Sequence, residues 1–281
     1  MRPKHLRPSF FIIGANKCGT SSLYRYILDN PGVLPCAKKE PDFFGQHSAD
    51  YIARHIEEYF ALFPTCDYRG PLKFTWEASD EAGASGPTTI VVNRRPDRHY
   101  ITGEASANTF HDVAPSLLYR YLPGIKLIVL LRNPVDRAYS HHRMYQRFSR
   151  RGHDLGIEIG HFEEDIRAEM AAHERGEQTE YIGPGMYVDL LRGWIATYGA
   201  ENVKILVTED LGQLRTARQI MMELEAYLGL PAHDYADILA RRFNRASPAR
   251  LDSTVRSLLA DFYRPHNARL QEYLGRELGW G

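Results

Sequence analysis

A glycine-rich turn near the start of the chain has the residue types that bind phosphate. Residues 10–22 read FFIIGANKCGTSS, an apolar run that breaks at glycine and continues into hydroxyl residues. A helix that begins at Gly19 presents backbone N–H donors and the positive end of its dipole, and the hydroxyl groups of residues 20–22 add further donors. Helix capping explains the same pattern, so this segment alone leaves capping and phosphate binding open.

The position of the lysine separates this turn from the loop that binds nucleoside triphosphates. That loop reads G-x-x-x-x-G-K-[ST], with its lysine after the second glycine. Here Gly14 and Gly19 keep the spacing, but Lys17 comes before Gly19. The displaced lysine argues against a metal-dependent kinase.

A second segment also combines a strand end with phosphate-binding chemistry. Residues 126–145 read KLIVLLRNPVDRAYSHHRMY, in which an apolar strand is followed by Arg132 and by Pro134, a residue suited to a first helical turn. Ser140 lies about two helical turns after Arg132, so both side chains can face one group. Arginine grips phosphate bidentately. Since ligands bind outside the carboxyl ends of parallel strands, we expect the two segments to meet on one nucleotide.

The two segments resemble the 5′-phosphosulfate loop and the 3′-phosphate motif of sulfotransferases that use 3′-phosphoadenosine-5′-phosphosulfate (PAPS). The likeness is to the carbohydrate branch related to heparan sulfate sulfotransferases and to its bacterial relatives, and it extends over nearly the whole chain. The other stretches that carry it are residues 30–33, 39–44, 103–106, 185–194, 205–211, 227–230, 262–267 and 274–280. Their order and spacing together are specific, although no single motif is decisive.

The resemblance implies PAPS as sulfuryl donor, adenosine 3′,5′-bisphosphate (PAP) as product, and no metal. Lys17 is then the catalytic residue that stabilises the leaving group. The residues implied to bind the nucleotide are Lys17, Cys18, Gly19, Thr20, Ser21, Ser22, Arg132, Ser140 and Arg245. Arg245 lies in the region of the family's K-G-R loop but does not match that loop cleanly.

A carboxylate is needed to accept the proton of the acceptor. Glu40 is the first choice, because it lies in a stretch similar to the family's K-E-x-x-F-F, and we expect Phe43 and Phe44 to supply apolar surroundings that raise its pKa. The alternative is that Glu40 only pairs with a neighbouring lysine on a loop. Glu104 is the rival base and Asp42 a weaker one.

The sequence does not identify the acceptor substrate. Many relatives carry a lysine and a T-P-x-Y sequence where this chain has residues 105–108, ASAN, so acceptor contacts do not transfer. The resemblance implies a hydroxyl, or less often an amine, of a carbohydrate, glycolipid or small metabolite. Two alternatives remain, a P-loop kinase-like phosphotransferase and a non-catalytic nucleotide-binding protein of the same fold.

The elements that must position these residues alternate between strand and helix. Apolar runs predict strands at 10–13, near 33, at 126–131 and at 203–207, and longer periodic segments predict helices at 20–28, 49–62, 135–148 and 158–175. This order predicts an α/β, P-loop-like three-layer fold with a mainly parallel central sheet flanked by helices. We expect one domain over 1–281. Region 63–100 is expected to be an insertion, with a breaker-rich loop at 77–87 between strands at 72–76 and 89–92 that serves as an acceptor-side lid.

Composition narrows the function classes. The 281 residues include 35 basic and 35 acidic residues, so no whole-surface attraction to nucleic acid is expected. No apolar run approaches the ~20 residues of a membrane helix, and the basic N-terminus leads into too short an apolar run for a signal peptide. Three cysteines without metal-type spacing agree with a reducing compartment, so we expect a cytoplasmic protein. The sequence does not indicate the oligomeric state.

Overall fold

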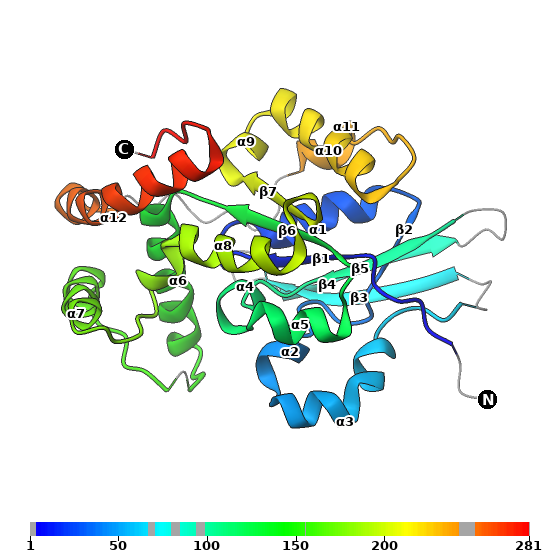
Figure 1. Cartoon of the computed structure of the whole chain (residues 1–281), viewed down its shortest axis with the longest axis horizontal. Coiled ribbons are helices and arrows are strands. Elements are labelled where there is room, and N and C mark those ends of the chain that lie inside the picture. The colour runs from blue at the N-terminus through cyan, green and yellow to red at the C-terminus, as the bar shows by residue number, and fades with distance from the viewer. Residues whose placement is uncertain are drawn as a thin grey trace. The chain divides into compact units, whose positions relative to one another are not determined.

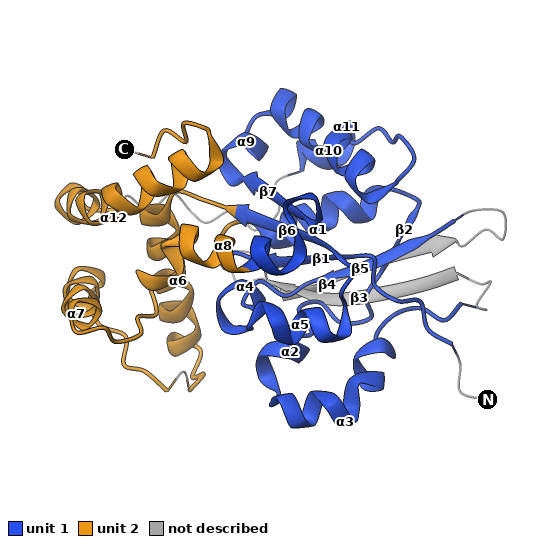
Figure 2. Ribbon diagram, viewed as in Figure 1, with its two compact units in different colours: residues 1–15, 19–130, 194–245 blue, residues 16–18, 131–193, 246–281 orange. Residues whose placement is uncertain are grey.

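The computed structural model of the chain describes residues 4–66, 71–79, 85–93, 99–154, 156–241 and 251–280, with the backbone alone in 71–79 and 85–93. The chain divides into two compact units (Figure 2). Unit 1 consists of residues 1–15, 19–130 and 194–245, and unit 2 of residues 16–18, 131–193 and 246–281. The expectation of one domain over the whole chain stays a prediction.

A five-stranded sheet forms the centre of unit 1 (Figure 1). Its strands are β1 (Phe10–Gly14), β2 (Val33–Pro35), β5 (Ile101–Ala105), β6 (Lys126–Leu131) and β7 (Val203–Val207). Their order across the sheet is β2-β5-β1-β6-β7, and β1 pairs in parallel with β5 and β6, as β2 does with β5. Every residue of β1 and β5 is buried, as expected for parallel strands covered on both faces. The predicted α/β fold with a parallel central sheet is confirmed.

Helices cover both faces of this sheet. The helices of unit 1 are α1 (Thr20–Asp29), α2 (Phe43–Gln46), α3 (Ala49–Phe60), α4 (Thr109–Asp112), α5 (Pro115–Tyr121), α9 (Thr208–Leu211), α10 (Leu214–Leu228) and α11 (Ala236–Ala240), with a short 3₁₀ turn η2 (Ala200–Asn202). Helices α1, α10 and α11 lie on one face, and α4 and α5 on the other (Figure 1). The Tyr227 hydroxyl of α10 donates to the Leu127 carbonyl of β6 over 3.0 Å.

Helix α8 (Tyr187–Tyr198) crosses the boundary between the two units. Its last turns contribute Trp194 to unit 1, where the side chain is 1% exposed and the indole N–H donates to the Phe110 carbonyl over 3.1 Å. A buried indole needs such an acceptor, so this bond fixes the ring within the core of unit 1.

A separate antiparallel pair forms where an insertion was expected. Strands β3 (Pro71–Ser79) and β4 (Ser85–Asn93) pair along their whole length, from Pro71 opposite Asn93 to Ser79 opposite Ser85. The predicted strands at 72–76 and 89–92 are confirmed, but the predicted loop at 77–87 is wrong at both ends, because residues 77–79 and 85–87 continue the strands. Residues 80–84 lie outside the described residues, and the lid role stays a prediction.

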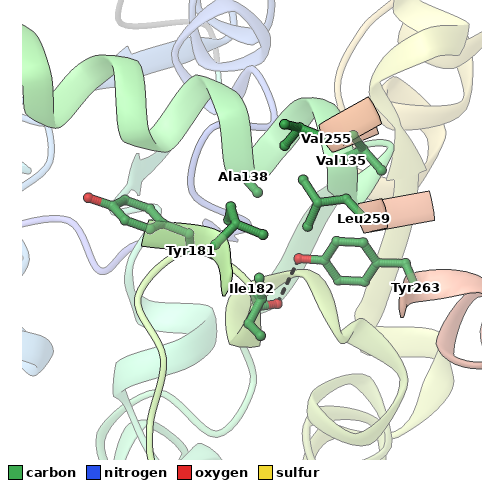
Figure 3. Close-up of a cluster of buried hydrophobic side chains, with 8 residues drawn as sticks. Val135, Ala138, Tyr181, Ile182, Val255, Leu259 and Tyr263 are labelled. Atoms are coloured by element: carbon green, nitrogen blue, oxygen red, sulfur yellow. Dashed lines mark hydrogen bonds between the residues drawn. The ribbon is translucent and has the colours of Figure 1, made fainter. Parts of the chain in front are cut away.

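Unit 2 is helical around its own apolar core. Its elements are α6 (Pro134–Arg150), α7 (Phe162–Glu174), the 3₁₀ turn η1 (Gly183–Gly185), the first turns of α8, and α12 (Ser253–Leu274). Figure 3 shows the core cluster, which consists of Val135, Ala138, Ile166, Tyr181, Ile182, Val255, Leu259 and Tyr263. Helix α7 is shorter at both ends than the charged helix predicted at 158–175.

Polar contacts inside unit 2 fix the 3₁₀ turn against two helices. The Tyr263 hydroxyl donates to the Ile182 carbonyl over 2.9 Å, and the fully buried Arg137 guanidinium donates to the Tyr181 carbonyl. A Cβ added to Gly185 would lie 2.8 Å from the Tyr263 oxygen and 2.9 Å from a Pro134 carbon. Only glycine permits this close approach, which explains why residue 185 is a glycine.

Two absences complete the description. Within the described residues, no helix combines the length and the apolar character that a bilayer crossing requires. Over the same ranges, no three His, Cys, Asp or Glu side chains gather into a group able to hold a metal ion.

Candidate active site

The first helix of unit 1 begins at an uncapped glycine. Gly19 is the N-cap of α1, has φ 90° and makes no side-chain cap. Its carbonyl accepts from the amides of Ser22 and Leu23 over 3.0 and 3.1 Å, so the helix starts abruptly. Glycine adopts this left-handed backbone without strain. Thr20 is buried, and Ser21 and Ser22 are half-buried beside the same first turn. The predicted combination of helix start and hydroxyl groups is therefore present in unit 1.

Lys17 belongs to unit 2, where it contacts the side chains of Met144 and Arg132. Its ammonium donates to the Met144 sulfur over 3.2 Å, and its carbonyl accepts from the Arg132 guanidinium over 3.1 Å. Lys17 has φ 67°, a left-handed conformation that a non-glycine residue adopts only when its surroundings hold it there. The Arg132 contact supplies part of that support.

Tyr187 links the same strand end to the following cysteine. Its hydroxyl donates to the Arg132 carbonyl over 2.8 Å and lies 3.8 Å from the Cys18 sulfur. Burial is the main cause that raises the pKa of Tyr187 well above 10, and the nearby Cys18 thiol raises it further. The phenol therefore stays a neutral donor. Cys18 is itself buried, and its thiol points to the Asn16 carbonyl over 3.7 Å. The cysteine thus has a packing role in this unit.

Three other residues are predicted to contact the nucleotide, namely Arg132, Ser140 and Arg245. Helix α6 begins as predicted, with Pro134 in its first turn and the Asn133 side chain accepting from the Val135 amide over 3.0 Å. Ser140 lies half-buried on this helix. A common phosphate between Ser140 and Arg132 stays a prediction, and Arg245 lies outside the described residues.

The Glu40 carboxylate is 44% exposed in unit 1. The Ser21 hydroxyl donates to it over 3.4 Å, and the Lys39 ammonium lies 3.9 Å away. Such an exposed pair contributes little, about 0–1 kcal/mol. Phe43 and Phe44 are buried and pack against Tyr59, with ring centroids 5.4 and 5.0 Å apart from it. The expectation that these two rings supply apolar surroundings for Glu40 stays a prediction.

Glu104 occupies the opposite environment at the end of β5. Its side chain is 1% exposed, and its two carboxylate oxygens accept from the Tyr59 hydroxyl over 2.8 Å and the Ser106 hydroxyl over 2.6 Å. Burial raises the pKa of Glu104 to about 7, although the two hydrogen bonds favour the charged form. Each oxygen of the Glu104 carboxyl group thus has a hydrogen-bond partner inside unit 1.

Asp42 connects these two glutamates. Its amide donates to the Ser106 oxygen over 2.9 Å, and its carboxylate accepts from the Asn108 amide over 3.2 Å. Burial raises the pKa of Asp42, and the Asn108 hydrogen bond opposes this shift. The Glu40 segment is thus joined to the residues that follow β5, where the sequence departs from its relatives.

Sequence reasoning missed three side chains of this arrangement. Tyr59 lies within the helix predicted at 49–62, and Tyr187 lies within the stretch 185–194 that carries the family resemblance, but neither was predicted as a site residue. Met144 carries no signal in the sequence, because its contact with Lys17 joins residues 127 positions apart.

Comparisons with known proteins identify the family of this chain. A model of the family described as Sulfotransferase family matches residues 8–190. Human bifunctional heparan sulfate N-deacetylase/N-sulfotransferase 3 is 25% identical over 95% of this chain and 30% of its own length. Human carbohydrate sulfotransferase 15 is 25% identical over 98% of this chain and 55% of its own. The chain therefore spans less than two thirds of the length of these relatives.

Solved structures agree with the fold. A sulfotransferase from Alicyclobacillus acidocaldarius superposes with a TM-score of 0.65 and 26% identity, covering 98% of both chains. A sulfotransferase domain from the curacin biosynthetic pathway, at 13% identity and a TM-score of 0.51, shares the fold. With the family match extending over well more than half of its residues, the chain belongs to the sulfotransferase family.

Proposed function

We propose that the chain transfers a sulfuryl group from PAPS to a hydroxyl, or less often an amine, of a carbohydrate, glycolipid or small metabolite. The observation that carries this proposal is the turn before α1, where a lysine precedes an uncapped helix start in a chain of the sulfotransferase family. The names of the human relatives, a heparan sulfate N-sulfotransferase and a carbohydrate sulfotransferase, support a carbohydrate acceptor.

The donor set of the turn fits an anionic phosphosulfate. PAPS supplies a sulfuryl group activated by its link to a phosphate. The first-turn amides of α1 and the hydroxyl groups of residues 20–22 offer neutral donors and a favourable dipole end. Lys17 contributes the positive charge, and its ammonium now contacts a thioether, which is a weak acceptor. Exchanging that contact for a phosphate oxygen strengthens the hydrogen bond, so the residues present fit the group.

In the proposed reaction, one proton moves to a base and one electron pair moves to the leaving group. Glu40 takes the proton of the acceptor hydroxyl while the acceptor oxygen bonds to sulfur. Lys17 donates a charge-assisted hydrogen bond to the phosphate oxygen that keeps the electron pair when its bond to sulfur breaks. The exposure of Glu40 supports this assignment, because a base must reach the acceptor.

The remaining residues hold the nucleotide in this proposal. Gly19, Thr20, Ser21 and Ser22, with the backbone of Cys18, bind the 5′-phosphate. Arg132 and Ser140 read the 3′-phosphate, and Arg245 adds a further contact. Arg132 has a second task, since its guanidinium also holds the Lys17 carbonyl. We also propose a cytoplasmic location for the chain.

Calorimetry tests the donor before any acceptor is known. The titrants are PAP without metal, ATP without metal, and ATP with Mg²⁺. We expect PAP to bind without metal and more tightly than ATP under both conditions, because the 3′-phosphate adds charge-assisted hydrogen bonds. Preference for magnesium-ATP would overturn the proposal and favour a kinase-like phosphotransferase. Turnover of PAPS with any carbohydrate acceptor would then exclude a purely nucleotide-binding role.

A further inference from the structure

The segment that carries Glu40 has an unfavourable backbone. Glu40 has φ 51° and Asp42 has φ 53°, so two non-glycine residues separated by a single proline are left-handed. Residues in this region persist only where their surroundings hold them. Asp42 is also the N-cap of α2, which follows at once. The direction in which Glu40 leaves the backbone therefore depends on whatever fixes Asp42.

A hydrogen-bond relay holds the Asp42 amide, while the Asp42 carbonyl accepts from the amides of Gly45 and Gln46 in the first turn of α2. The Asp42 amide donates to the Ser106 oxygen over 2.9 Å, and the Ser106 hydroxyl donates to the Glu104 carboxylate over 2.6 Å. A hydroxyl has a single proton, so donation to Glu104 turns the lone pairs of Ser106 toward the amide. Ser106 is fully buried and Glu104 is 1% exposed, which leaves little water to replace either bond.

The carboxylate sets the direction of this relay. Ser106 donates to Glu104, and the ionised form, which dominates above the pKa of about 7, enforces this direction because an ionised carboxylate only accepts hydrogen bonds. The Tyr59 hydroxyl occupies the other oxygen of Glu104 over 2.8 Å. Both oxygens are thus committed inside the protein. Glu104 has the wrong environment for a base that must contact an acceptor.

We propose that Glu104 and Ser106 are positioning residues for Glu40, which they hold in place through the Asp42 amide. The inference rests on the proposed function, in which Glu40 is the base. It also separates the two glutamates that the sequence left as rivals: the exposed one contacts the acceptor, and the buried one orients the segment that carries it.

Ser106→Ala tests the relay, with Tyr59→Phe as matched control. The alanine variant breaks the bond to the Asp42 amide and keeps Glu104. The phenylalanine variant removes a hydrogen bond of similar length from the same carboxylate but leaves the Ser106 bonds intact. The first readout is hydrogen exchange in a peptide covering residues 40–46, which needs no turnover. The second is kcat together with the Kd for PAP.

We expect Ser106→Ala to speed exchange in this peptide and to lower kcat by about 10- to 100-fold, the order of loss for a misplaced catalytic group. The Kd for PAP should stay within about twofold of wild type, a difference well below a tenfold step in affinity. Tyr59→Phe should change none of the three quantities, namely the exchange rate, kcat and the Kd for PAP. Glu104→Leu should behave like Ser106→Ala, and the double variant should be no worse than either single variant, because both break one relay.

Two results would overturn the inference. One is unchanged exchange at residues 40–46 in Ser106→Ala, and the other is an equal effect of Tyr59→Phe, which indicates general loosening of the core. The first result stays decisive even if Glu104→Leu fails to fold. Glu40→Gln separates this from the proposed function: wild-type turnover in that variant would overturn the role of Glu40 as base, whereas the exchange rates alone decide whether the relay holds the turn.

Discussion

Glu104 should make the stability of the protein depend on pH in a way that a single substitution removes. Burial is the main cause that raises the pKa of Glu104 to about 7 from an ordinary value of 4.5. The folded protein then holds its proton more tightly than the unfolded chain does. The stability associated with the neutral carboxyl is fully present below pH 4.5, and it is lost as the pH rises through about 7.

The size of this effect follows from the two pKa values. At about 1.4 kcal/mol for each tenfold change in proton affinity, ionisation of the buried carboxyl lowers the free energy of unfolding by about 3 kcal/mol at high pH. Most of this loss falls between pH 5 and pH 8. The neighbouring Tyr24, Tyr59 and Cys36 do not contribute in that window, because burial raises each of their pKa values above the ordinary range.

Glu104→Gln supplies the comparison, since glutamine keeps the shape and has no titrating proton. Urea unfolding followed by far-ultraviolet circular dichroism at several pH values gives the free energy of unfolding of both proteins. The difference in free energy of unfolding between wild type and variant should change by about 2–3 kcal/mol from pH 5 to pH 8, because the wild type becomes less stable relative to the variant as the pH rises. Titrating groups that do not interact with Glu104 cancel in that difference. Parallel pH curves would refute the reasoning that the Glu104 carboxyl is desolvated and near neutral pKa.

Three further predictions concern the turn, the second strand end and the core of unit 2. Lys17→Ala should lower kcat by about 100- to 1,000-fold while calorimetry still detects bound PAP, and unchanged turnover would remove Lys17 from the leaving-group role. Arg132→Ala should abolish the calorimetric preference for adenosine 3′,5′-bisphosphate over the 5′-monophosphate; a preserved preference would mean that other residues read the 3′-phosphate. Leu259→Ala, at a fully buried position, should cost about 2–5 kcal/mol in urea unfolding, whereas Leu214→Ala, at a residue 49% exposed, should stay within about 0.5 kcal/mol. Equal costs for the two leucines would contradict the assigned core.

Local apolar patterns were enough to predict most of the sheet and its helices. Strands at 10–13, 126–131 and 203–207 needed only a short apolar run between turns, and each strand was found there. The same reasoning failed at the ends of β3 and β4. There the small and breaker-rich residues 77–79 pair with residues 85–87 and extend the ladder of the strands that precede and follow them, despite a weak intrinsic preference for strand.

The candidate site was predictable in its motifs and not in its contacts. Glycine, lysine and hydroxyl types identified the turn before α1, because phosphate chemistry needs those groups close together in sequence. The surroundings of the carboxylates depend instead on long-range packing. The Tyr59 hydroxyl donates to Glu104 across 45 positions in the sequence, and the Tyr59 ring also packs against Phe43 and Phe44. No local pattern contains that information.

The placement of the indole rings gives each unit an intrinsic optical reporter. Trp194 is buried in unit 1, and Trp280, 7% exposed, lies in unit 2 with its ring centroid 6.1 Å from that of Tyr187. The sequence contains one other tryptophan, Trp76. In a Trp76→Phe background, replacing either remaining indole leaves the fluorescence emission of a single unit. The unfolding transitions of the two single-tryptophan proteins coincide if the units unfold as one cooperative block, and they occur at different denaturant concentrations if the units unfold independently.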